Sequence, residues 1–171
     1  MDNVDVHGSR ARHDGLANST ATGWWVAALA GAGAFWLTNL AISLTPVAAA
    51  YRSAQSIRYV PMLVEAAVGG LVIASAVAFL LSRFPGQVPG GGVVRKALLL
   101  ALGALILLTV LLEMPAKLRS DLPDSGQWLL VATVFNTVRI LALGVSVGGV
   151  THYRTTRHDR HHPATGREAK P

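Results

Sequence analysis

The sequence predicts an all-α integral membrane protein folded as an antiparallel four-helix bundle. Of its 171 residues, 51% are hydrophobic and only 14% are charged, whereas a typical soluble domain has about 25% charged residues. The charged residues cluster in the tails and in short connectors. Between them stand four apolar runs, 24–44, 60–84, 93–114 and 128–150. Each is long enough to cross a hydrocarbon core about 30 Å thick, so we expect no soluble domain.

The chain divides into three expected parts. A polar tail (1–23) precedes the transmembrane domain (24–150), and a basic, His-rich tail (151–171) follows it. We expect the first tail to be disordered, because it is rich in polar residues and glycine. It is not a signal peptide, since the first apolar run starts late and is too long. The net charge of +6 lies mainly in the last tail and one connector, without interleaved aromatic residues, so we expect no nucleic-acid partner.

Several cofactor classes are excluded by composition. The chain has no cysteine, which rules out the disulfide chemistry used by some four-helix membrane enzymes. No histidine lies in the four apolar runs, which argues against haem ligation. His158, His161 and His162 in the last tail would share a helical face, but a solvated tail beside anionic lipid is the favoured interpretation. We expect no cofactor and no metal.

The first two apolar runs have the features of closely packed helices. Trp24 and Trp25 are typical of an anchor at the membrane interface. Small residues recur four apart in both runs, which permits close approach of helix backbones. They are Ala27, Gly31, Ala30 and Ala34 in the first run and Ala66, Gly70, Ala74 and Ala78 in the second. Glu65 stands beside the second stripe, so we expect its carboxylate to face the bundle.

The connector 45–59 contains Tyr51, Arg52, Arg58 and Tyr59. Alternating tyrosine and arginine at a membrane edge predicts a short interfacial helix. Two interpretations follow. The side chains anchor the segment among lipid headgroups, which is the favoured one, or the segment is a lid over a binding site.

The third and fourth runs differ in polarity. Run 93–114 is dominated by leucine and ends at Glu113, before a mixed-charge connector. Run 128–150 begins at Trp128 but has Asn136 and Arg139 in its interior. These two residues are three apart, so on a helix they point within about 60° of each other. A charge at this depth costs about 2.5–3.5 kcal/mol on insertion scales and requires a partner or a hydrated cavity.

Basic residues predict the orientation. Eight of them flank the helix ends on the side of the termini: Arg10, Arg12, Arg83, Arg95, Lys96, Arg154, Arg157 and Arg160. Four flank the other side: Arg52, Arg58, Lys117 and Arg119. We therefore expect both termini in the cytoplasm of a bacterium, with the protein in the plasma membrane.

This orientation gathers five polar residues in the outer half of the bilayer, namely Asn39, Glu65, Glu113, Asn136 and Arg139. Glu65 is the first choice as partner for Arg139, with Glu113 close behind. The layer is either a structural salt bridge or a pocket open to the outer side. For a pocket, the catalytic candidates are Arg139, Glu65, Glu113 and Asn136, and the substrate-binding candidates are Asn39, Trp36, Tyr59 and Trp128.

One family resemblance rests on these positions. Glu113-Met114-Pro115 with its mixed-charge connector, followed by Trp128, Asn136 and Arg139, resembles the anthrone oxygenase-like family of small four-helix membrane proteins, most of them uncharacterised. The resemblance covers residues 41–150. It implies the cofactor-independent oxygenation of aromatic polyketides that some members carry out, while the roles of most members are unknown.

Three function classes remain open, and with them the question of whether the chain is an enzyme. The first is a membrane protein whose pocket acts on a lipophilic or aromatic small molecule, with Glu65 and Arg139 as an acid/base pair. The second is an accessory or scaffolding subunit that packs its small residues, including Gly144 and Gly148, on a larger membrane partner or on another copy. The third is a small transporter in which Glu65 carries protons.

Overall fold

The computed structural model describes residues 7–115 and 125–161, and every element in them is helical. The elements are α1 (His7–Ser43), α2 (Pro46–Ala54), α3 (Tyr59–Arg83), α4 (Val93–Leu108), the π-helical turn η1 (Thr109–Glu113) and α6 (Ser125–His161). Four segments are long and apolar enough to cross a membrane: Trp24–Ser43, Tyr59–Arg83, Val93–Leu111 and Gly126–Arg157. The predicted all-α class is confirmed, and the chain is a multi-pass integral membrane protein.

The two longest helices extend into the expected tails. α1 begins at His7 and α6 continues to His161, so residues 7–23 of the tail expected to be disordered (1–23) are helical. Helix nucleation is costly but propagation is not, so a membrane-spanning helix can continue into a polar segment. With 37 residues each, α1 and α6 are about 55 Å long, well beyond the thickness of the hydrocarbon core. His162 lies outside the described residues.

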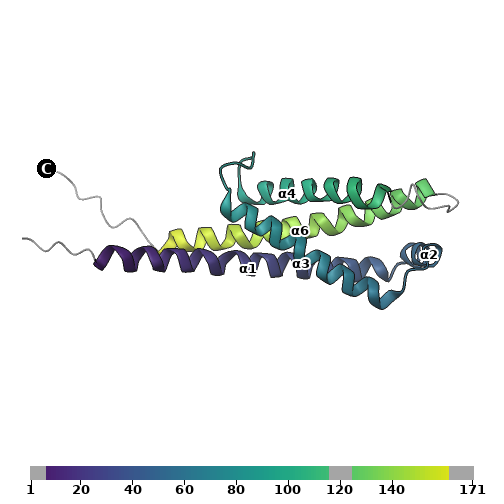
Figure 1. Ribbon diagram of the computed structural model, residues 1–171, viewed down its shortest axis with the longest axis horizontal. Coiled ribbons are helices and arrows are strands. Elements are labelled where there is room, and N and C mark those ends of the chain that lie inside the picture. The colour runs from purple at the N-terminus through teal and green to yellow at the C-terminus, as the bar shows by residue number, and fades with distance from the viewer. Residues whose placement is uncertain (1–6, 116–124, 162–171) are drawn as a thin grey trace, which may run out of the picture.

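α1 and α6 lie side by side at the centre of the bundle (Figure 1). α3 packs on α1 and α4 packs on α6, while α3 and α4 meet only sparsely. A Cβ added to Gly31 would lie 2.5 Å from Val147 Cγ2 and 3.2 Å from Ala74 Cβ. At this glycine, therefore, α1 comes into close contact with both α6 and α3.

The small residues predicted to pack do so inside this chain. Gly70, Ala74 and Ala78 of α3 are buried and Ala66 is half-buried, and a Cβ on Gly70 would lie 2.7 Å from Phe35 Cδ1 of α1. The largest fully buried side chains are Ile140, Leu143 and Val147 of α6, Val77 of α3 and Asn39 of α1. The core is therefore made mainly along the central pair of helices, with α3 completing it.

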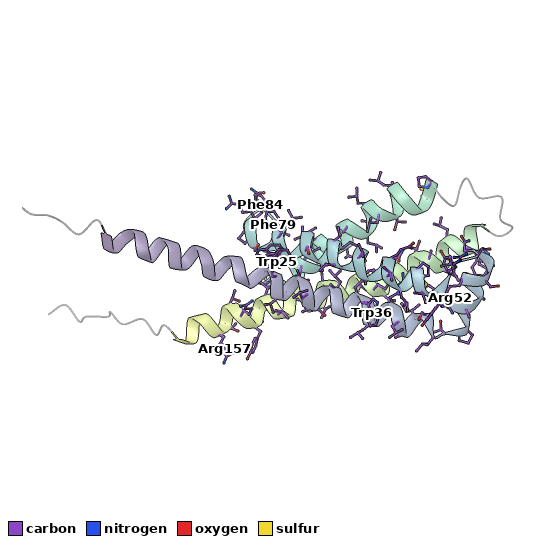
Figure 2. The ribbon with its side chains drawn as sticks, turned by 60° about the horizontal axis from the view of Figure 1, so that its bottom comes forward. Trp25, Trp36, Arg52, Phe79, Phe84 and Arg157 are labelled. Atoms are coloured by element: carbon purple, nitrogen blue, oxygen red, sulfur yellow. The ribbon has the colours of Figure 1, made fainter. Side chains whose placement is uncertain are left out.

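Aromatic side chains mark both ends of the bundle, with Trp24, Trp25 and Phe79 at one end and Tyr51 and Trp128 at the other. At the end with the termini, called the terminal end, Trp24 stacks on Trp25 and meets the edge of Phe79. Figure 2 shows Trp25 and Phe79 far from Arg52, which lies at the opposite end, the α2 end. The first span between these ends has 20 residues, about 30 Å of helix. The spacing matches the two aromatic belts of a membrane protein.

α2 is the short helix predicted in the connector 45–59. Thr45 caps its N-terminus by accepting a hydrogen bond from the Ala48 N–H at 3.2 Å, and Pro46 occupies the first turn. These are favoured residues at a helix start. Beyond its C-terminus, Ser56 has a φ of 52°, a left-handed conformation that favours glycine. Ser56 thus lies in the turn that connects α2 to α3.

The third span is not a regular α-helix throughout. At η1 the Met114 N–H donates to the carbonyl of Thr109, five residues back. Pro115 follows directly, and a proline ring clashes with the carbonyl four residues before it. Widening the preceding turn into a π-helix relieves that clash, and such turns are frequent at functional sites.

Candidate functional site

Arg139 lies half-buried on α6 and is held by its own helix. Its Nη1 donates a hydrogen bond to Oδ1 of Asn136 at 3.0 Å. The guanidinium carbon lies 6.0 Å from the centroid of the Phe135 ring. Asn136 and Arg139, which the sequence predicts on one face of the helix, are thus joined by a hydrogen bond, and a neighbouring aromatic ring adds a cation–π contact.

α2 brings further aromatic groups to this part of α6. The Tyr51 ring meets Trp128 edge-on at 5.9 Å between centroids and Phe135 at 6.2 Å. Two of these rings, those of Tyr51 and Phe135, were not identified as site residues from the sequence. We call Tyr51, Trp128, Phe135, Asn136 and Arg139 the Arg139 cluster.

Asn39 lies at the depth of this cluster. Gly31 of α1 contacts Val147 of α6. Asn39 lies about two turns from Gly31 toward the α2 end, and Arg139 lies about two turns from Val147 in the same direction, because α6 is antiparallel to α1. The Asn39 side chain is 0% exposed. Neither amide atom has a hydrogen-bond partner among the described residues. Leaving such a group unpaired costs about 1–3 kcal/mol, a cost that a ligand with hydrogen-bonding groups would offset.

Glu65 does not lie where the sequence suggested. It is exposed on α3, so the prediction that it faces the bundle is wrong. Neighbouring residues on a helix point about 100° apart, and Ala66, not Glu65, carries the packed face. Near the start of the span a glutamate can reach the interface without a buried partner. The side chain of Glu113 lies outside the described side chains, so its pairing with Arg139 stays a prediction.

The remaining predicted binding residues have structural contacts. The indole N–H of Trp36 donates to the carbonyl of Leu63 at 3.2 Å, which ties α1 to α3. Tyr59, the first residue of α3, has its hydroxyl 3.2 Å from Oγ of Ser43. Neither residue joins the Arg139 cluster through a described contact.

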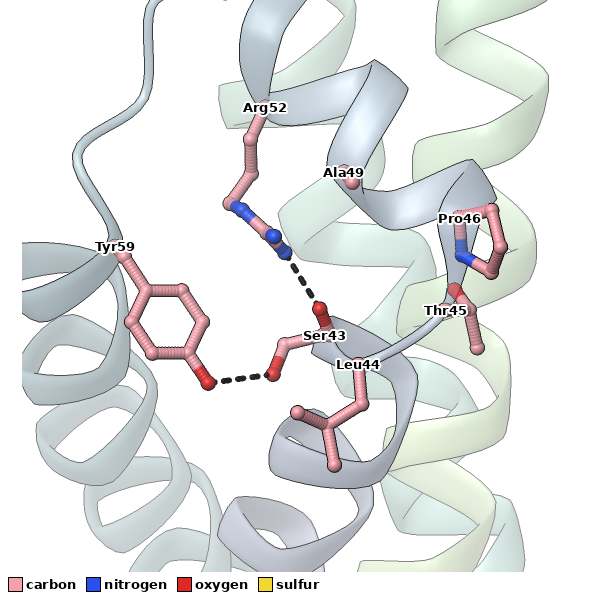
Figure 3. Close-up of a pocket in the computed structure, with 7 residues that line it drawn as sticks. All are labelled: Ser43, Leu44, Thr45, Pro46, Ala49, Arg52 and Tyr59. Atoms are coloured by element: carbon pink, nitrogen blue, oxygen red, sulfur yellow. Dashed lines mark hydrogen bonds between the residues drawn. The ribbon is translucent and has the colours of Figure 1, made fainter.

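A pocket of about 540 Å³ lies at the α2 end, on the side of α1 and α3 (Figure 3). Its lining consists of Ser43, Leu44, Thr45, Pro46, Ala49, Arg52 and Tyr59. Tyr59 is the one residue of this lining that the sequence suggested as a binding residue. The sequence pattern that could have indicated this pocket is the alternation of tyrosine and arginine at Tyr51, Arg52, Arg58 and Tyr59. The pocket itself forms because α2 folds against the end of α1.

Two further expectations can be compared with the structure. Gly144 and Gly148 pack under α4 of the same chain, where added Cβ atoms would lie 3.0 Å from Ala101 Cβ and 2.7 Å from Val94 Cα. They are therefore not available to a partner subunit. Within the described residues no group of three or more His, Asp or Glu side chains could hold a metal ion.

Comparison of the chain with protein-family models, with curated proteins and with solved structures finds no match.

Proposed function

We propose that the Arg139 cluster, with Asn39, binds a lipophilic aromatic small molecule that carries an acidic or enolic oxygen. The observation that carries this proposal is an intramembrane arginine, hydrogen-bonded to Asn136, beside the rings of Phe135, Tyr51 and Trp128. Ionisable groups at such depth are functional-site candidates by default.

The residue types suit this ligand chemistry. Aromatic rings offer faces and edges to a flat apolar molecule. A guanidinium presents its N–H donors in a planar fork, a geometry that suits the oxygen atoms of an oxyanion. Inside a bilayer this charge is poorly screened, which strengthens its effect on a developing enolate. Asn39 would supply an amide at the same depth.

The resemblance to anthrone oxygenase-like proteins suggests a concrete reaction. An enolisable tricyclic ketone such as anthrone would lose a proton from its methylene carbon to water and form an enolate, which Arg139 would stabilise. Molecular oxygen is then the oxidant: anthrone and O₂ give anthraquinone and water. Because Glu65 is exposed, this proposal replaces the earlier acid/base pair and assigns Glu65 no role.

The test uses purified full-length protein in phosphatidylcholine nanodiscs. Anthrone binding is measured by calorimetry, and turnover by oxygen uptake and anthraquinone formation. We expect Arg139→Leu to weaken binding at least tenfold and Arg139→Lys to have a smaller effect, because lysine keeps the charge but loses the planar donor geometry. The control is Arg83→Leu, which removes an exposed arginine at the terminal end.

Either of two results would reject the small-molecule proposal: wild-type protein that binds no anthrone, or equal loss in the Arg139 and Arg83 variants. Binding without oxygen uptake would keep the site and reject the oxygenase reaction. Of the alternatives, the transporter hypothesis relied on a bundle-facing Glu65, and this residue is exposed. The subunit hypothesis relied on small residues that pack on a partner, and two of these, Gly144 and Gly148, pack against α4 of this chain.

The proposed orientation places both termini in the cytoplasm and the α2 end outside. It is supported by the basic residues of the connector between α3 and α4, which lies at the terminal end. Because the chain has no cysteine, Ser56→Cys and Gly91→Cys would each carry a single thiol. In intact cells an impermeant maleimide should label the first variant and not the second, and the opposite pattern would reverse the orientation.

A further inference from the structure

The pocket beside Arg52 is separate from the Arg139 cluster and needs its own explanation. Arg52 lies on α2 next to Tyr51, yet it contacts the end of α1 and the start of α3. Its Nη1 donates to the carbonyl of Ser43 at 2.8 Å, and its guanidinium carbon lies 5.0 Å from the centroid of the Tyr59 ring. Figure 3 shows Arg52 and Tyr59 on two sides of Ser43.

The guanidinium retains donor capacity. Of its five N–H groups, the bond to Ser43 uses one. Within residues 7–115 and 125–161, Arg52 forms no ion pair with a carboxylate. The charge is therefore held in place by a carbonyl and a ring, neither of which neutralises it. An anion with several oxygen atoms would match the remaining donors.

The hydroxyl groups of the pocket are largely committed to the fold. Ser43 Oγ donates to the carbonyl of Leu40 at 2.6 Å, so the Tyr59 hydroxyl is the donor in its contact with Ser43. Thr45 Oγ1 donates to the carbonyl of Ile42 at 2.7 Å and accepts from the α2 backbone. Arg52 is thus the main group in the pocket with hydrogen-bond donors for a ligand, so the ligand must carry hydrogen-bond acceptors.

The position of the pocket points to lipid as the source of that anion. Ser43 is the last residue of the first candidate span and Tyr59 is the first of the second, so the pocket lies at the boundary where headgroups stand. Leu44 in its wall is 75% exposed. Val47 and Val60 nearby are also exposed, and together they offer an apolar surface to acyl chains.

We propose that this pocket binds the phosphate headgroup of an anionic membrane phospholipid through Arg52. The volume of about 540 Å³ is within the range of small-ligand sites, about 300–1,000 Å³. The N-terminus of α2, whose first residues line the same pocket, adds a favourable partial positive charge. This inference uses neither Arg139 nor Asn136, so it is independent of the proposed small-molecule site.

The test measures lipid binding to full-length protein by native mass spectrometry in detergent. Phosphatidylglycerol is titrated against phosphatidylcholine for the wild type, Arg52→Gln, Arg52→Lys and the exposed control Arg83→Gln. We expect preferential binding of phosphatidylglycerol, weakened about tenfold in Arg52→Gln and less in Arg52→Lys, because a charged hydrogen bond is lost or reduced. Arg83→Gln should bind as the wild type does.

Several outcomes would overturn the proposal. They are equal binding of the two lipids, unchanged binding in Arg52→Gln, or an equal loss in Arg83→Gln, which would indicate net charge alone. Displacement of lipid by inorganic phosphate at millimolar concentration would assign the pocket to a soluble anion instead.

Should Arg52→Gln fail to fold, wild-type protein still decides the question. A phosphatidylglycerol with a photoreactive group near its phosphate should label residues 43–59. Labelling confined to other segments would reject the site.

Discussion

Gly148 and Gly149 are neighbours on α6 with opposite surroundings, and replacing each by alanine tests the packing of α4. A Cβ on Gly148 would lie 2.7 Å from Val94 Cα and 3.1 Å from Ala97 Cβ. The first of these is a backbone atom, which no side-chain rotation can move away. A Cβ on Gly149 would meet nothing within 4 Å.

The two variants share one favourable effect, so their difference isolates the clash. Replacing glycine by alanine in a helix stabilises it by up to about 1 kcal/mol. Gly149→Ala should show only that gain. Gly148→Ala must in addition push α4 away, at a cost of about 1–3 kcal/mol for overpacking. We therefore expect the free energy of unfolding of Gly148→Ala to be lower than that of Gly149→Ala by about 1–3 kcal/mol.

The assay is equilibrium unfolding in detergent micelles, followed by tryptophan fluorescence and repeated by circular dichroism. Equal stability of the two variants, or a more stable Gly148→Ala, would refute the close contact of α4 with α6.

Three further predictions use the same assays. Asn39→Leu should raise the free energy of unfolding by about 1–3 kcal/mol, since leucine removes an unpaired amide of similar size; a loss of stability would show that water or another group satisfies Asn39. Ser56→Gly should raise it by about 1 kcal/mol by relieving the left-handed backbone, whereas Ser53→Gly, within α2, should lower it. Glu65→Gln should leave folding yield and anthrone binding unchanged because this side chain is exposed, and a tenfold effect on either would contradict that placement.

The sequence was sufficient to predict the spans and the packing stripes. A run of about 20 apolar residues has few alternatives in a bilayer, because every backbone polar group must be satisfied within the segment. The stripe from Ala66 to Ala78 likewise has one favourable use, the close approach of a second helix. Asn136 and Arg139 share one face of α6, as their separation of three residues predicts.

Contacts between elements were less accessible to sequence reasoning. The orientation of Glu65 depends on which side of the stripe α1 occupies, and the sequence does not encode that in any local pattern. The pocket at Arg52 depends on how α2 folds back from Thr45. The π-helical turn could have been expected from Pro115, since a proline disturbs the turn before it, but its form depends on packing.

The arrangement of the helices has a consequence for how the protein is made. α3 and α4 are consecutive in the chain, yet α3 packs on α1 and α4 packs on α6. During synthesis α1 and α3 can associate as soon as both have left the ribosome, while α4 enters the bilayer before its partner exists. Its span, Val93–Leu111, is apolar enough to cross the membrane, so it can remain in lipid as an independent helix until α6 is inserted. We therefore expect assembly to finish only when the last helix is inserted, so that a chain truncated before residue 125 would leave α4 unassembled and open to quality-control proteolysis.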